Sequence, residues 1–262
     1  MYNFDFVKPS TVEEAVAALA DDEAQPLSGG QTLIPTMKQR LNAPETLVSL
    51  LGIEALKGVT VGGDRVTIGA ATTHATVARE VAEAYPALAA LAGNIGDPAV
   101  RNRGTIGGSL ANNDPAACYP AAALASGATV VTNRREIPAD EYFEGMFATA
   151  LEEGEIITRV TFPIPEAAAY VKFEQPASRF ALAGVFVAKF AGGVRVAITG
   201  ASEEGVFRWS EAEEALSGNF SAGAVSALSL DADGMMADLH GSAEYRAHLA
   251  KVLTGRAVTA AG

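Results

Sequence analysis

Two short stretches of this chain combine a hydroxyl residue with paired glycines, a pattern suited to holding an anion. The first is Ser28-Gly29-Gly30-Gln31-Thr32-Leu33, and the second is Thr105-Ile106-Gly107-Gly108-Ser109, which continues to Asp114. Because glycine has no Cβ, the backbone can turn sharply there and a ligand can approach its N–H groups closely. Successive N–H groups in such turns form concave nests that bind anions. Two converging nests would suit the diphosphate of a dinucleotide.

A glycine pair alone is not diagnostic, because two further pairs mark ordinary turns. Gly62-Gly63 and Gly192-Gly193 each lie between strand-like runs, and we expect β-hairpins at both. The stretch 93–117, which contains the second motif, lacks periodicity, and we expect a long loop there. Loops of that length in compact domains are usually functional or disordered. Its interleaved Ile106 and Leu110 argue against disorder.

Other reactive side chains form no recognisable catalytic or metal-binding set. The three histidines, at 74, 240 and 248, lack the ligand spacing of a metal site, and we expect them at the surface. There is no Gly-x-Ser-x-Gly elbow, no phosphate loop ending in Gly-Lys-Ser/Thr, and no Gly-x-Gly-x-x-Gly after a strand. Side-chain acid–base catalysis is therefore not predicted, and neither is a metal on this chain.

Two single residues remain open to a structural or a functional interpretation. Cys118 is the only cysteine, so the chain can form no internal disulfide and no thiolate cluster; it is either a reactive thiol or a packed core residue. Lys172 lies in an apolar strand-like run. It is either a lysine that extends to solvent at an edge or a cation beside an anionic cofactor.

Composition excludes several classes of partner. The net charge of −12 and pI near 4.7 disfavour nucleic acid and anionic membrane surfaces. No apolar run reaches the length of a membrane-spanning helix, and the N-terminus lacks a signal-peptide pattern. With one cysteine, a reducing cytoplasm is the expected compartment.

Both helices and strands must position these motifs, and the expected fold class is α+β. A helix capped by Ser10, a strand at 24–27, a helix at 32–41 and a strand at 46–50 form a first segment ending near residue 55. A second segment, 56–165, begins with a hairpin and ends at a proline-rich stretch. The third, 170–262, has strands followed by helices, without the alternation of a parallel α/β fold.

Together these motifs resemble the FAD-binding medium subunits of molybdenum hydroxylases, the carbon monoxide dehydrogenase and xanthine dehydrogenase family. The resemblance covers essentially the whole chain. It rests on the two glycine stretches in their order, and on Phe4-Asp5-Phe6-Val7-Lys8-Pro9, Ile68-Gly69-Ala70-Ala71-Thr72-Thr73, Glu155-Ile156-Ile157 and Ala243-Glu244-Tyr245-Arg246.

The resemblance implies an FAD-binding domain at 1–165 of the vanillyl-alcohol-oxidase-like type, in two parts at about 1–55 and 56–165. A smaller α+β domain at 170–262 follows. The implied cofactor-binding residues are those of the two glycine stretches and five beyond them: Ser28, Gly29, Gly30, Gln31, Thr32, Leu33, Thr105, Ile106, Gly107, Gly108, Ser109, Asp114, Cys118, Leu151, Lys172 and Phe180.

One position departs from the family pattern. Members usually carry aspartate where this chain has Cys118, and that carboxylate hydrogen-bonds the flavin. A thiol is a weak donor and a poor acceptor. We expect FAD still to bind, but more weakly or with a shifted potential.

The implied function is that of an FAD-carrying electron-transfer subunit in a heterotrimer, with two heterotrimers paired into a dimer. A large partner would hold the molybdenum cofactor, a small partner would hold 2Fe-2S clusters, and an external acceptor would take the electrons. Two alternatives remain: a self-sufficient flavin-dependent oxidoreductase, and a non-catalytic assembly subunit whose nests are empty or hold another phosphate ligand.

Overall fold

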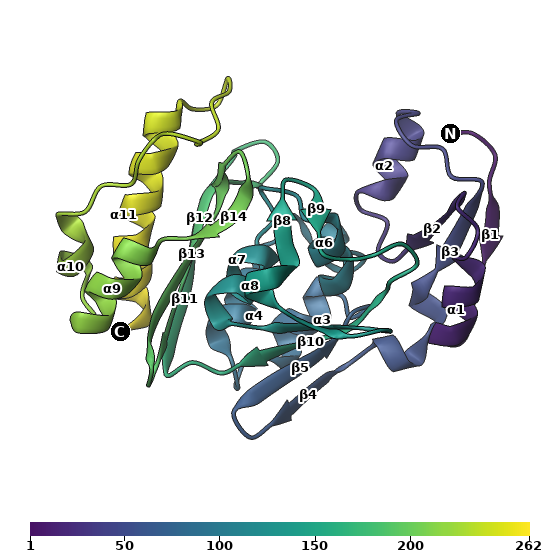
Figure 1. Ribbon diagram of the computed structural model, residues 1–262, viewed down its shortest axis with the longest axis horizontal. Helices are drawn as coiled ribbons and strands as arrows, with labels where there is room; N and C mark the ends of the chain where they lie inside the picture. Colours follow the sequence, from purple (N-terminus) through teal and green to yellow (C-terminus); the bar gives the residue numbers. More distant parts are fainter.

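The computed structural model describes residues 1–262 and contains three larger sheets that follow one another along the molecule (Figure 1). The N-terminus and the C-terminus lie at opposite ends of this row. A two-stranded hairpin accompanies the middle sheet. None of the helices combines the length and apolar character needed to traverse a lipid bilayer.

The first sheet is small and parallel, with strand order β1-β3-β2. Helical crossovers connect its strands, as parallel pairing requires. Thr11, rather than the expected Ser10, caps the first helix, because its side chain accepts the amide of Glu14. The elements are β1 (Asp5–Val7), α1 (Val12–Ala18), β2 (Ala24–Leu27), α2 (Leu33–Lys38), β3 (Thr46–Ser49) and the short 3₁₀ turns η1 (Leu50–Gly52) and η2 (Glu54–Leu56).

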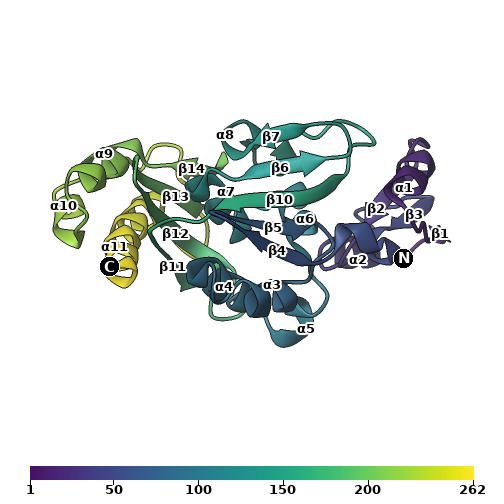
Figure 2. The same cartoon turned by 90° about the horizontal axis from the view of Figure 1, so that it is seen from below.

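The second sheet is antiparallel, with order β4-β5-β10-β6-β7, and the predicted hairpin at Gly62-Gly63 joins its first two strands. Figure 2 shows helices α3, α4 and α5 below it. Its strands are β4 (Val59–Gly62), β5 (Arg65–Gly69), β6 (Thr129–Thr132), β7 (Glu136–Pro138) and β10 (Ile157–Pro163). Its helices are α3 (His74–Glu80), α4 (Pro86–Gly93), α5 (Pro98–Arg101), α6 (Ile106–Asn112), α7 (Tyr119–Ser126) and α8 (Ala139–Tyr142).

One expectation for this middle segment is wrong. The stretch 93–117 is not an irregular loop, because α5 and α6 occupy much of it. Asp97 and Thr105 cap these two helices through their side chains. Such N-cap residues mark a helix start even where the following residues show no apolar periodicity. After the single turn of α8, the chain continues into the hairpin of β8 (Phe143–Gly145) and β9 (Ala148–Thr149).

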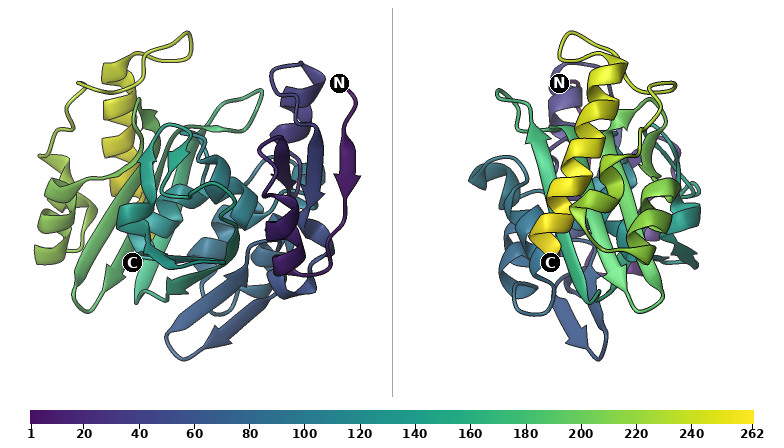
Figure 3. Two further views of the ribbon diagram at one scale, coloured as in Figure 1. Left: turned by 45° about the vertical axis from the view of Figure 1, so that its right-hand side comes forward. Right: turned by 90° about the vertical axis from the view of Figure 1, so that its left-hand side faces the viewer.

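The third sheet is antiparallel in the order β11-β12-β13-β14, and it contains the second predicted hairpin at Gly192-Gly193. Figure 3 shows the long α11 lying across this sheet with α9 and α10 beside it. The elements are β11 (Ala167–Glu174), β12 (Ala181–Phe190), β13 (Gly193–Ser202), β14 (Gly205–Arg208), α9 (Ser210–Gly218), α10 (Ala222–Ser226) and α11 (Ala243–Ala261).

Strand β12 is buried on both of its faces. Phe186 and Ala188 join the apolar core of the middle segment, whereas Val185 and Val187 join the core beneath α11. Because successive side chains of a strand point to opposite faces, one continuous apolar run serves two cores. The middle and third segments are therefore packed together through this strand.

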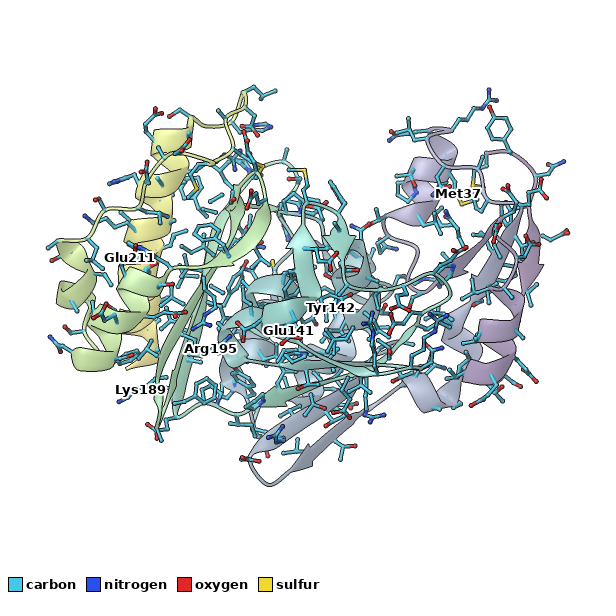
Figure 4. All side chains as sticks on the ribbon, viewed as in Figure 1. Met37, Glu141, Tyr142, Lys189, Arg195 and Glu211 are labelled. Atoms are coloured by element: carbon cyan, nitrogen blue, oxygen red, sulfur yellow. The ribbon has the colours of Figure 1, made fainter.

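Polar contacts reinforce that packing. Arg195 of β13 donates to Asp140 Oδ1 of α8 at 2.7 Å and to the Leu124 carbonyl of α7. Figure 4 labels Arg195 and, on α8, Glu141 and Tyr142. These contacts hold the third sheet against α8 and against α7, whose N-cap residue is Cys118.

Candidate functional site

The first glycine stretch is a turn between β2 and α2 that presents unused backbone donors. Gly30 has φ +68°, a conformation that glycine adopts without strain. The amides of residues 29–32 donate to no other group of the chain, and the N-cap Thr32 makes no side-chain capping bond. Free amides at the start of a helix form an anion-binding site. The predicted nest is therefore present here.

The second glycine stretch is the first turn of α6, and most of its amides are already used. The amides of Ile106 and Gly107 donate to the carbonyls of Thr72 and Ala70 at 3.2 and 2.9 Å. Gly108 N donates to Thr105 Oγ1 at 3.2 Å. The expected nest of free amides is therefore wrong for this stretch, because the helix and its neighbouring strand occupy these donors.

Close packing explains the glycine at 107. A Cβ there would lie 2.5 Å from the Cβ of Ala70, at the end of β5, so α6 can approach the sheet only without that atom. What the second stretch presents to the cavity is different from a nest: the hydroxyls of Thr105 and Ser109, the Gly108 backbone and the positive end of α6.

The two stretches touch each other. Ser28 Oγ and Thr105 Oγ1 lie 2.8 Å apart. A Cβ on Gly29 would lie 2.2 Å from the Arg103 carbonyl oxygen, so the first turn packs on the backbone that leads into the second. The convergence predicted from the sequence is confirmed, although only one turn contributes a row of free amides.

Both stretches line a single cavity of about 730 Å³. That volume falls within the usual range for pockets that bind cofactors. Every predicted binding residue lines this cavity except Ile106, whose side chain is fully buried in the core. The cavity therefore brings together segments from all three parts of the chain: residues 28–33, 105–118, 151 and 172–180.

Lys172 lies at one end of the cavity, where its ammonium group joins three segments. Its Nζ donates to the carbonyls of Asn94 and Arg179 at 2.7 and 2.9 Å, and Cys118 Sγ lies 3.9 Å away. Its side chain is only 1% exposed. The interpretation of a lysine extending to solvent at an edge is therefore wrong. The ammonium holds the turn that carries Phe180, which is half exposed.

Cys118 is buried in the apolar core, as the interpretation of a packed residue expects, and it also lines the cavity. Burial raises the pKa of its thiol above the ordinary value, and the positive charge of Lys172 partly opposes this rise. The thiol is therefore kept in its neutral form beside Lys172.

A buried carboxylate fixes the loop that carries Leu151. Although burial would raise the pKa of Glu155, hydrogen bonds from Arg135, the Glu152 amide and the Thr132 hydroxyl outweigh it and lower the pKa to about 2. The glutamate of the Glu-Ile-Ile motif therefore lines the cavity and anchors the loop beside Leu151.

His74 lines the cavity and was missed as a site residue; its predicted surface position is wrong, although His240 and His248 are exposed. The side chain is 5% exposed, and burial together with the charge of Arg101 lowers its pKa to about 4. A signal did exist: His74, Val77 and Val81 fall at helical spacing and share one buried face.

Comparison with known proteins identifies the family. Residues 2–165 match the FAD binding domain in molybdopterin dehydrogenase. The chain is 35% identical over 274 residues to the nicotine 6-hydroxylase medium subunit of Paenarthrobacter nicotinovorans, with 98% of this chain and 96% of that one covered. The carbon monoxide dehydrogenase medium chain of Hydrogenophaga pseudoflava is 34% identical over 280 residues, covering 98% and 96%.

Solved structures agree. Reconstituted CO dehydrogenase from Oligotropha carboxidovorans superimposes with a TM-score of 0.91 at 33% identity, covering 100% of this chain and 99% of that chain. Quinoline 2-oxidoreductase from Pseudomonas putida 86 gives a TM-score of 0.88 at 30% identity, covering 98% and 96%. The free amides at 29–32 and the size of the cavity fit a nucleotide diphosphate. This chain is therefore an FAD-binding medium subunit of the molybdenum hydroxylases, a family of oxidoreductases.

Proposed function

We propose that this chain is the electron-transfer subunit of a heterotrimeric molybdenum hydroxylase. Electrons released on a large subunit with the molybdenum cofactor pass through 2Fe-2S clusters on a small subunit to FAD here, and then to an external acceptor. The observation that carries the proposal is the contact between Ser28 and Thr105 over a cavity lined by both glycine stretches.

The chain's own contribution is to hold and orient the cofactor. The free amides of residues 29–32 bind the diphosphate, and the hydroxyls of Thr105 and Ser109 complete its surroundings. Asp114 and Cys118 continue the wall away from these turns, and Asp114 is held by the bond that its Oδ1 accepts from the Ala116 amide. Binding by backbone donors requires no basic side chain, which suits a strongly acidic protein.

The other end of the cavity receives the flavin ring. Leu151 supplies apolar surface, Lys172 closes the end, and Phe180 lies where its exposed ring can cover the flavin. Bound FAD supplies two-electron redox chemistry, while the protein supplies position and electrostatic environment. Arg135 and Glu155 keep Leu151 in place from behind.

Residues 1–165 form the FAD-binding domain of the vanillyl-alcohol-oxidase-like type, divided near residue 55, and residues 170–262 form the C-terminal domain. The break between β10 and β11 supports the second boundary, because the chain passes there from the second sheet to the third. Two such heterotrimers associate into a dimer.

The test begins with the visible spectrum of the purified full-length chain and with its native complex. We expect flavin bands from FAD, co-purification of a large and a small subunit with molybdenum and iron, and flavin bleaching by substrate only in the complex. Bleaching of this chain alone by a small substrate would indicate a self-sufficient flavoenzyme. An absence of bound flavin would indicate an assembly subunit. Reoxidation of the reduced complex by a quinone, oxygen or NAD then identifies the acceptor.

A further inference from the structure

His74 is fixed beside the second glycine stretch by backbone contacts on both sides. It is the first residue of α3, capped by Thr73, and its amide donates to the Gly104 carbonyl at 3.0 Å. Thr73 and Thr105 also form an antiparallel bridge. The imidazole therefore has a defined place relative to the turn that faces the diphosphate.

The surroundings of this imidazole leave one nitrogen with no partner. Nδ1 is enclosed and makes no hydrogen bond, while the ring packs on Tyr119 with centroids 5.3 Å apart. Nε2 lies against Gly104, where a Cβ would approach it to 2.5 Å. Both His74 and Gly104 line the cavity. Buried polar atoms without partners are rare in folded proteins and call for a physical reason.

The protonation state follows from this geometry. Burial, with the Arg101 charge, holds the pKa of His74 near 4, so the ring is neutral at pH 7 and carries a single N–H. An enclosed donor without an acceptor costs more than an enclosed lone pair. The proton therefore belongs on Nε2, next to the cavity-lining Gly104.

We propose that His74 is a further FAD-binding residue, whose Nε2–H donates to an oxygen of the ribityl–phosphate arm. The segment 94–104 spans the distance between the two ends of the cofactor. The Asn94 carbonyl is bound by Lys172 at the proposed flavin end, and Gly104 precedes Thr105 at the diphosphate end. His74 contacts the Gly104 end of this segment. The assignment rests on the proposed path of FAD along the cavity.

Three substitutions separate hydrogen bonding from packing. His74→Gln places an amide N–H near the position of Nε2, His74→Asn places it near Nδ1, and His74→Leu has no donor. We expect the Kd for FAD, measured by fluorescence titration of the full-length apoprotein, to rise about tenfold or more in the Asn and Leu variants. The Kd of the His74→Gln variant should stay within about threefold of the wild-type value. As a control, His248→Gln, at an exposed position, should leave the Kd unchanged.

Melting temperatures of the apoproteins serve as the control for folding. We expect His74→Leu to melt no lower than wild type, because it removes an unpaired buried nitrogen. A Kd that follows melting temperature in all three variants, Gln included, would show that His74 is only a packed core residue. Wild-type affinity in the Leu variant would also overturn the proposal.

A spectroscopic readout is independent of affinity. In ¹⁵N-histidine-labelled protein, the His74 Nε2 resonance should have the chemical shift of a protonated nitrogen and should move when FAD is added. A proton on Nδ1, or an Nε2 signal indifferent to FAD, contradicts the inference. Neither measurement depends on electron transfer, so the inference and the proposed function can fail separately.

Discussion

Ser28 and Thr105 are 77 positions apart in the sequence, yet their hydroxyl oxygens lie 2.8 Å from each other. The bond is part-buried and joins the turn after β2 to the cap of α6. Since Thr105 Oγ1 also accepts the Gly108 amide, one hydroxyl both starts a helix and holds the neighbouring turn. The two turns that we propose hold the diphosphate are therefore mechanically linked.

Ser28→Ala and Thr105→Ala should each weaken FAD binding by about tenfold, since each removes the shared bond and loosens the contact between the turns. In the double variant the losses should not add, and a coupling of about 0.5–1.5 kcal/mol should remain. Fluorescence titration of the four apoproteins measures this cycle. Fully additive losses would show that the two hydroxyls act independently.

Gly29→Ala should abolish or strongly weaken FAD binding. The added Cβ would lie 2.2 Å from the Arg103 carbonyl oxygen and 2.7 Å from the Gly104 Cα, so the two turns must separate. Overpacking of this kind costs about 1–3 kcal/mol. Gly62→Ala is the matched control, because a Cβ there meets nothing within 4 Å. The flavin content of the purified proteins reports the result, and equal content would refute the packing role of Gly29.

Cys118→Asp should bind FAD more tightly than wild type and shift its midpoint potential. The new carboxylate would lie where Cys118 Sγ is 3.9 Å from Lys172 Nζ, and a carboxylate is a far better acceptor than a thiol. We expect a change of at least about 30 mV, equivalent to about 1.4 kcal/mol for a two-electron couple. Spectroelectrochemistry measures the potential, with Cys118→Ser as a neutral control; identical potentials would reject the idea.

Glu155 should make the protein sensitive to acid. The folded-state pKa of Glu155, about 2, lies below its ordinary value of 4.5. Its contribution to the free energy of unfolding is therefore complete above pH 4.5 and is lost as pH falls toward 2. Because the side chain of its partner Arg135 is 42% exposed, screening reduces this contribution to about 1–2 kcal/mol.

Urea unfolding at about pH 5 and about pH 3 measures how much the free energy of unfolding falls between these two pH values. We expect that fall to be smaller in Glu155→Gln than in wild type. Glu54→Gln, in an ion pair whose carboxylate side chain is 84% exposed, should behave like wild type. An unchanged pH dependence in Glu155→Gln would contradict the assignment.

Sequence patterns predicted the helices and strands, and the stretches that line the cavity, better than they predicted which backbone amides are free to donate. Caps, apolar periodicity and hairpin turns are local signals, which is why the helix that begins near Ser10 and the hairpin at Gly62-Gly63 could be predicted. Whether an amide is free depends on tertiary partners. The amides of the second stretch donate to the carbonyls of Ala70 and Thr72. No residue near Gly107 in the sequence indicates these distant acceptors.

Single residues were hardest where their surroundings come from distant segments. Lys172 is buried because its ammonium group contacts the Asn94 carbonyl and the turn at Arg179. The alternation of side chains along its own strand contains no sign of either contact. Strand β1 has three exposed residues and pairs in parallel with β3, so it offers no hydrophobic alternation to detect. The convergence of the two glycine stretches was predicted from their shared pattern, from the chemistry of a diphosphate and from the resemblance; the contact between Ser28 and Thr105 was not predicted.

Because β12 and β13 contribute Phe186, Ala188 and Ala197 to the core of the middle segment, the residues before 165 cannot complete that core alone. A ribosome-bound chain that has emerged only through β10 would lack Lys172, Phe180 and the apolar surface that closes the middle core. On the proposed assignment of Lys172 and Phe180 to the flavin end of the cavity, capture of FAD must then wait until synthesis has passed β12.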